Sequence, residues 1–276
     1  MTAVRVSSSW LALREPADAV ARAVDLVAKL QRHLPGRRPL VVHDLACGTG
    51  SMLRWLAPRL AGPQHWVCHD LDADLLAETL REQRPQAADG SAVTVDVRQG
   101  DVTRLAPGEC VGAALITTSA LLDLLTADEL DRLVATCMTE QSPALLSLSV
   151  TGRVELRPPH PLDAAIADAF NAHQRRSTDG RQLLGPDAAA AAVRAFRSFG
   201  CDVVVRTSPW RLGAESSALT SAWLTGWLSA ACEQRPELTA HAAEYARQRH
   251  ADAAAGRLRV LVQHRDLLVL PRRGPR

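Results

Sequence analysis

The hydrophobic pattern of the first 150 residues alternates short apolar runs with amphipathic stretches. Runs that start at Leu40, His65, Val93, Val111 and Ala144 have the length and the β-branched or apolar content of buried strands. Between them, leucines recur three or four residues apart, as they do on one face of a helix. Five strand–helix repeats of this kind predict a parallel, doubly wound α/β sheet.

The first predicted strand runs directly into a glycine-rich turn. Apolar residues 40–42 are followed by Asp44, then by Gly48 and Gly50, after which the leucine spacing marks a helix. Glycine has no Cβ, so the backbone can turn tightly here and lie close against a ligand. A strand, a glycine-rich turn and a helix begin a nucleotide-binding unit, whose ligand lies beyond the carboxyl ends of the strands.

Acidic residues follow the next two strands at that same edge. Asp70 stands 20 residues beyond Gly50, which is the separation expected for a carboxylate that hydrogen-bonds a ribose hydroxyl. Asp101 follows the third strand in the same way. Asp70 could instead cap a helix, as we expect for Asp72, but its position at a strand tip favours a ligand.

The second half of the chain departs from this alternation. Its pattern predicts helices over 161–176, 186–199, 215–234 and 236–255, and strands over 201–207 and 259–270. A further helix is expected over 10–34. We therefore expect one domain, 1–276, with an N-terminal lid helix region (1–37), a cofactor-binding core (38–150) and substrate-side helices with the final strands (151–276).

Composition narrows the class of protein. The net charge of the 276 residues is only +2, which gives no electrostatic case for nucleic acid. Six scattered cysteines, without a C-x-x-C pair, indicate reduced thiols in a cytoplasmic protein. No signal core and no membrane-spanning run is expected. His65 and His69 share one side of a strand but lack a third ligand, so we expect no metal. The expected partner is a small molecule, and a homodimer is left open.

The motifs resemble those of the class I S-adenosylmethionine-dependent methyltransferases over about residues 38–150. The matching segments are Asp44-Leu-Ala-Cys-Gly48-Thr-Gly50, Asp70, Gly100-Asp101 and Thr117-Thr-Ser-Ala-Leu-Leu-Asp123, and Ala46 stands where the family usually has its first glycine. The resemblance implies a seven-stranded Rossmann-like sheet with an antiparallel last strand, and helical insertions that form a substrate cap. It also implies S-adenosyl-L-methionine as cofactor.

The resemblance further implies a set of cofactor-binding residues. The glycines would approach the methionine moiety, Asp70 would hold the ribose, and Asp101 and Val102 would bind the adenine, on which Leu71 would pack. Arg14, in the expected lid, is predicted to pair with the methionine carboxylate. The whole predicted set is Arg14, Asp44, Ala46, Gly48, Gly50, Asp70, Leu71, Asp101, Val102 and Thr117.

The acceptor side is predicted from the chain beyond the fourth strand. Arginines cluster in sequence there, and they suit a small-molecule acceptor that carries an anionic group. We expect Arg153, Arg176 and Trp210 to bind it. His173 is the first choice as general base and Asp123 the second, with positions 173 and 176 of their helix turned toward the pocket.

Two alternatives to a methyltransferase remain open at this point. An NAD-dependent oxidoreductase is disfavoured because Leu53 occupies the place of the third glycine of G-x-G-x-x-G. A non-catalytic S-adenosylmethionine-binding protein is disfavoured by the many polar side chains over 171–176.

Overall fold

The computed structural model describes the chain except for residues 1–5, 35, 37–38, 83, 107, 179 and 273–276. Ten strands are found in the described chain: β1 (Leu40–Leu45), β2 (Gln64–Asp70), β3 (Val93–Gln99), β4 (Leu115–Ser119), β5 (Ala144–Arg157), β6 (Ser177–Thr178), β7 (Arg181–Gln182), β8 (Asp202–Thr207), β9 (Trp210–Leu212) and β10 (Arg259–Leu270). The α-helices are α1 (Ser8–Ala21), α2 (Val24–Gln31), α3 (Ser51–Leu56), α4 (Ala73–Arg81), α5 (Ala127–Glu140), α6 (Asp163–Gln174), α7 (Ala188–Ser198), α8 (Ser217–Gln234) and α9 (Thr239–Ala254).

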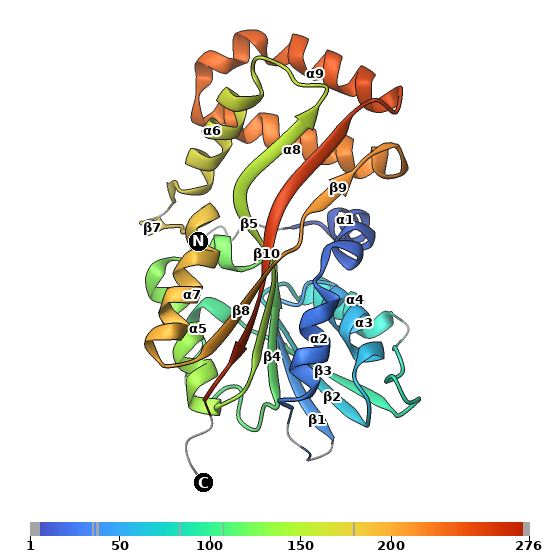
Figure 1. Ribbon diagram of the computed structural model, residues 1–276, viewed down its shortest axis with the longest axis vertical. Helices are drawn as coiled ribbons and strands as arrows, with labels where there is room; N and C mark the ends of the chain where they lie inside the picture. Colours follow the sequence, from blue (N-terminus) through green and yellow to red (C-terminus); the bar gives the residue numbers. More distant parts are fainter. Residues whose placement is uncertain are drawn as a thin grey trace.

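The main sheet has the order β3-β2-β1-β4-β5-β10-β8, and β9 also pairs with β10. Strands β1 to β5 pair in parallel, whereas β10 is antiparallel to both β5 and β8. Figure 1 shows helices α2, α3 and α4 on one side of this sheet and α5 and α7 on the other. The predicted doubly wound sheet with an antiparallel last strand is therefore confirmed.

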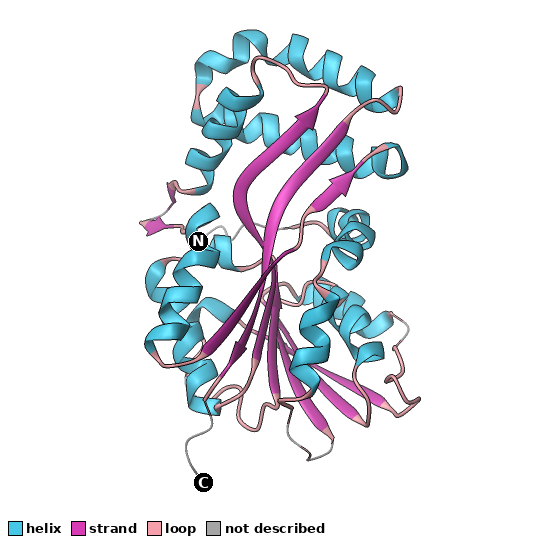
Figure 2. Ribbon diagram, viewed as in Figure 1, coloured by secondary structure: helices cyan, strands magenta, loops and turns pink. Residues whose placement is uncertain are grey.

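Two strands extend well beyond the parallel sheet. The fifth strand was expected to end at Val150, but β5 continues to Arg157 and pairs with β10 from Arg157↔Arg259 onward. Figure 2 shows both strands rising out of the sheet into an upper layer. Helices α6, α8 and α9 cover this extension, and the three helices and the strands share one apolar cluster that includes Trp227 and Tyr245. The molecule thus has a lower sheet, in which strands β1 to β5 are parallel, and an upper antiparallel extension.

The N-terminal segment forms two helices where one was expected. The break falls at Arg22 and Ala23, where the Ala23 N–H donates to the buried carboxylate of Asp266 at 2.8 Å. Arg22 is itself buried and its guanidinium donates to the hydroxyls of Ser51 and Ser119. This polar anchoring replaces the helical hydrogen bonds at the break.

Among the described residues, none of the helices combines the length and apolar character that crossing a bilayer requires.

Candidate active site

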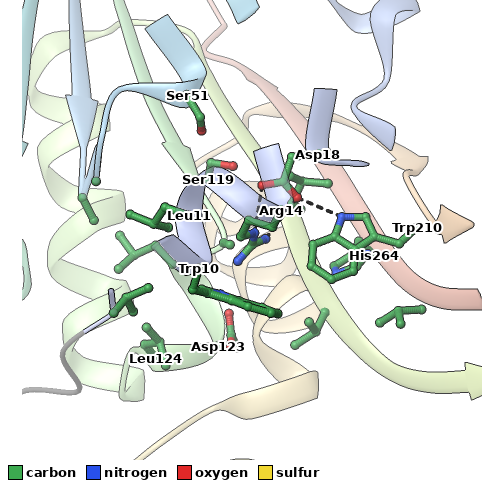
Figure 3. Close-up of a pocket in the computed structure, with 18 of the residues that line it drawn as sticks. Trp10, Leu11, Arg14, Asp18, Ser51, Ser119, Asp123, Leu124, Trp210 and His264 are labelled. Carbon is green, nitrogen blue, oxygen red and sulfur yellow. Dashed lines mark hydrogen bonds and ion pairs between the residues drawn. The ribbon is translucent and has the colours of Figure 1, made fainter. Parts of the chain in front are cut away.

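A cavity of about 730 Å³ lies at the carboxyl ends of β1, β2 and β4, below the upper extension. Its walls come from α1, the glycine-rich turn, the bend of β5, α6 and the strands β9 and β10 (Figure 3). Its volume is in the range of small-molecule sites. Of the residues named in the sequence analysis, the cavity is lined by Arg14, Asp44, Ala46, Gly48, Asp70, Leu71, Asp123, Arg153 and Trp210.

The glycine-rich turn has the conformation for which its sequence is suited. Ala46, Gly48 and Gly50 all have positive φ angles (54°, 56° and 83°). A Cβ on Gly48 would lie 3.0 Å from Leu11 Cδ1 of α1. Glycine at this position therefore lets α1 lie directly against the turn. Gly50, whose N–H donates to the Cys47 carbonyl, caps α3 and lies outside the cavity lining.

Asp70 holds the turn from the neighbouring strand. One carboxylate oxygen accepts from the Gly48 N–H at 2.8 Å and the other from the Asp72 N–H at 3.0 Å. Each carboxylate oxygen has a second lone pair, so the side chain can still accept from a ligand hydroxyl. Beside it, Leu71 is about half exposed (49%) and lines the cavity.

Asp44 is a buried carboxyl group at the floor of the cavity. It accepts from the hydroxyl of Thr117 at 2.8 Å, while its other oxygen, Oδ2, has no hydrogen-bond partner among the described residues. Burial raises the pKa of Asp44 to about 7, against the opposing effects of the Thr117 hydrogen bond and the Arg22 charge. Thr117 is fully buried and contributes to the site only through Asp44.

Side-chain contacts hold helix α1 over the cavity at two places. Arg14 pairs with Asp18 at 2.9 Å and lies 4.9 Å from the ring centre of Trp210, whose indole N–H donates to Asp18 at 2.8 Å. On the other side, Glu15 pairs with Arg54 of α3 at 2.5 Å. Figure 3 shows Arg14 between Trp10 and Trp210. The cationic group predicted for the methionine carboxylate is thus in the cavity, but it already has an anionic partner.

The predicted adenine-binding pair lies further out. The Asp101 carboxylate accepts from the Thr103 N–H and hydroxyl and pairs with Arg104 at 3.4 Å. In the described part of the chain, neither Asp101 nor Val102 is part of the cavity lining. Their predicted contact with the adenine stays a prediction.

Helix α6 turns a different face to the cavity from the one predicted. Phe170, Asn171 and Gln174 line it, whereas His173 and Arg176 do not. His173 lies against α8, where its Nε2 contacts Glu233 at 3.0 Å, and its Nδ1 contacts Arg176 at 2.6 Å. We therefore correct the predicted placement: these two side chains are engaged in packing α6 on α8, away from the space beyond the glycine-rich turn.

The other predicted acceptor residues are at the cavity. Trp210 is buried, and Arg153 lies at the rim, with 69% of its side chain exposed and a 2.5 Å ion pair to Glu155. Asp123, in the turn after β4, has its pKa raised to about 6, chiefly by burial. Figure 3 shows Asp123 below Trp10 and Arg14.

Asn171 and His264 are polar groups of the cavity that were not assigned to it from the sequence. Asn171 lines the cavity while its amide donates to the Gly152 carbonyl at 2.8 Å. His264, from β10, is buried against Trp210, and burial lowers the pKa of His264 to about 3, so its ring is neutral. The polar run 263–266 inside an otherwise apolar strand was the available signal.

Comparisons with known proteins find the same fold. Residues 42–140 match a family model described as a methyltransferase domain. Among solved structures, the YcgJ protein from Bacillus subtilis superimposes with a TM-score of 0.50 at 12% identity, covering 91% of this chain and 100% of that one. A search of curated sequences finds no match.

Two further structures are similar with lower scores. The cyclopropane synthase MmaA2 from Mycobacterium tuberculosis has a TM-score of 0.47 at 12% identity over 96% of this chain and 94% of its own. The magnesium protoporphyrin IX methyltransferase from Synechocystis has 0.44 at 17% identity over 76% and 84%. At such identities the structural likeness concerns the fold alone.

The family model therefore covers the glycine-rich turn, Asp44, Asp70 and the first four strands, which are the segments that carried the resemblance. The sheet order around them is the one predicted. Residues 42–140 thus match a methyltransferase domain, and the sheet around them has the order of the Rossmann-like methyltransferase fold.

Proposed function

We propose that the protein transfers a methyl group from S-adenosylmethionine to a small-molecule acceptor with an apolar body. The observation that carries this proposal is the continuity of the cavity. The same space is lined by Gly48 and Asp70 at one end and by the rings of Phe170, Trp210 and Trp223 at the other. Donor and acceptor would thus share one enclosed site.

The cofactor end fits the donor on structural grounds. Gly48, in the turn with positive φ, lines the cavity, and Asp70 keeps acceptor capacity for ribose hydroxyls. The unpartnered Oδ2 of Asp44 is a buried hydrogen-bond acceptor, suited to the ammonium group of the methionine moiety. Arg14 would bind the carboxylate of that moiety if its guanidinium donated hydrogen bonds to both Asp18 and the ligand.

The acceptor end favours apolar or aromatic molecules. Aromatic side chains from four separate elements surround it, and Val150, Val154 and Val262 add aliphatic contacts. The prediction that the acceptor carries an anionic group rests on fewer residues. Of the arginines predicted for the acceptor side, only Arg153 lies at the cavity rim, where it pairs with Glu155. We keep the anionic group as a prediction tied to that side chain.

The chemistry asks for positioning, exclusion of water and removal of one proton. S-adenosylmethionine supplies an electrophilic methyl group, whose bond to sulfur breaks with the electron pair remaining on sulfur. The cavity walls hold the acceptor in line and exclude water. Asp123 is the proposed general base, since its raised pKa of about 6 lets an ionised carboxylate take a proton near neutral pH.

The test is a transfer screen with radiolabelled S-adenosylmethionine over phenols, amines and carboxylic acids that carry an aromatic or aliphatic body. Transfer to at least one apolar acceptor, reduced in a Trp223→Ala variant of unchanged cofactor affinity, is the expected result. Binding of S-adenosylhomocysteine without transfer to any acceptor of these classes would contradict the proposal.

A further inference from the structure

Three side chains with metal-binding donor atoms converge on the face of the sheet opposite to Asp44. They are His43 of β1, His69 of β2 and Cys110 in the segment that precedes β4. One donor atom from each lies within 4.8 Å of the donor atoms of the other two, and all three residues are buried. Consecutive strand residues point to opposite faces, so His43 and His69 lie behind Asp44 and Asp70.

The spacing of these donors is close to that of a tetrahedral site. His43 Nδ1 and His69 Nε2 are 3.0 Å apart. Zinc–nitrogen bonds of about 2.05 Å and a zinc–sulfur bond of about 2.3 Å place two nitrogens about 3.3 Å apart and a nitrogen and sulfur about 3.6 Å apart. Separations within 4.8 Å therefore need only shifts of about 1 Å to reach coordination distances.

The three donors are buried, and the charges around them act in opposite directions. The charge of Arg98 opposes a cation here, whereas Glu109 and Glu140, near Cys110, favour one.

We propose that His43, His69 and Cys110 bind one Zn²⁺ ion, with a water molecule in the fourth position. Binding releases the Cys110 proton to solvent, and the bond forms between the thiolate and the metal. Two imidazoles and one thiolate are a donor set that Zn²⁺ favours. The ion would join β1 and β2 to the segment before β4, behind the glycine-rich turn.

A simple hydrogen bond between the two histidines is the competing explanation of their approach. That explanation needs no third donor, whereas the metal site requires the Cys110 sulfur. The role of this sulfur in metal binding therefore separates the two, and it can be read by spectroscopy independently of methyl transfer.

The test uses Co²⁺ as a spectroscopic probe and Zn²⁺ as competitor on the full chain after chelator treatment. We expect one Co²⁺ per chain, with a thiolate-to-cobalt charge-transfer band and the intense visible bands of tetrahedral coordination, displaced by one equivalent of Zn²⁺. Cys110→Ala should abolish the charge-transfer band, and His69→Gln should weaken Zn²⁺ binding by about 100-fold.

Matched controls lie close by in the chain. Cys137 is as buried as Cys110 but is not in the donor group, and His65 lies in the same strand as His69 with a hydrogen bond to Thr94. Cys137→Ala and His65→Gln should bind Co²⁺ and Zn²⁺ as the wild type does. Wild-type protein without stoichiometric binding or without the charge-transfer band would overturn the proposal, whether or not the variants fold. Equal binding by folded Cys110→Ala and wild-type protein would overturn it too.

Discussion

The lower sheet and the upper antiparallel extension contribute to one cavity in different ways. In the lower sheet, the contacts around the cavity join neighbouring strands at their carboxyl ends: the Asp70 carboxylate accepts from the Gly48 N–H, and Asp44 accepts from Thr117 of the neighbouring strand. In the upper extension, the contacts join helices to each other or to a strand, such as His173 of α6 to Glu233 of α8 and Trp210 of β9 to Asp18 of α1. The residues at the lower end of the cavity thus take their positions from the strand register, whereas those at the upper end take theirs from how the helices pack.

The largest expected effect concerns Asp123, the proposed general base. Asp123→Asn should lower kcat by about 100-fold or more, because the amide cannot take the acceptor's proton. In the wild type, kcat/KM should rise with pH through about 6 and then level, since the Asp123 carboxyl is protonated and inactive below its raised pKa. A pH–rate profile of both proteins checks this.

Asp123→Asn should leave S-adenosylhomocysteine affinity unchanged. If this variant transferred methyl groups at the wild-type rate, or had the same pH profile as the wild type, Asp123 would not be the general base.

The next largest effect is expected for a variant in the lower sheet. Asp70→Ala should weaken S-adenosylhomocysteine binding by about 100-fold, because it removes both a charged acceptor for the ribose and the clasp on Gly48. Calorimetric titration measures it. Asp74→Ala, an exposed acid in the first turn of α4, is the matched control and should bind like the wild type. Equal affinities for the two variants would show that Asp70 has no part in binding.

A smaller effect is expected for a variant at the upper extension. Asn171→Ala should reduce kcat/KM for the acceptor by about tenfold, because the side chain lines the cavity and fixes the Gly152 carbonyl by a hydrogen bond. His173→Gln, on the α8-facing side of the same helix, should change kcat/KM by less than about twofold. Steady-state kinetics with the acceptor found in the screen measures kcat/KM for both variants. A larger loss in His173→Gln than in Asn171→Ala would show that the 173/176 face of α6 belongs to the site.

The smallest effect concerns Arg14 of α1. Arg14→Ala should weaken S-adenosylhomocysteine binding by about fivefold, since the guanidinium divides its hydrogen bonds between Asp18 and the ligand carboxylate. Lys29→Ala, far along the next helix and paired at the surface with Asp202, serves as control. An unchanged affinity in a folded Arg14→Ala protein would assign Arg14 wholly to the contact with Asp18 and Trp210.

The same contrast explains which features the sequence could predict. The glycine-rich turn, Asp44 and Asp70 could be placed together because they lie at the carboxyl ends of neighbouring strands, and the spacing along each strand–turn–helix unit shows those ends. The face of α6 was assigned wrongly because both of its faces carry polar side chains. Only the packing of α8, which supplies Glu233 sixty residues away, decides which face is covered.

The extent of β5 could not be read from the sequence for a related reason. Residues 151–157 contain alternating polar positions and precede two prolines, which favours a linker. Their strand conformation comes from pairing with β10, whose partners are about one hundred residues further along the chain. His264 belongs to the same pairing, and its place in the cavity follows from it.

The most direct test of the central claim is a calorimetric titration of the wild-type protein with S-adenosylhomocysteine and, separately, with NAD⁺. The account predicts saturable binding of one S-adenosylhomocysteine per chain and no measurable heat from NAD⁺. Saturable binding of NAD⁺ without binding of S-adenosylhomocysteine would contradict it.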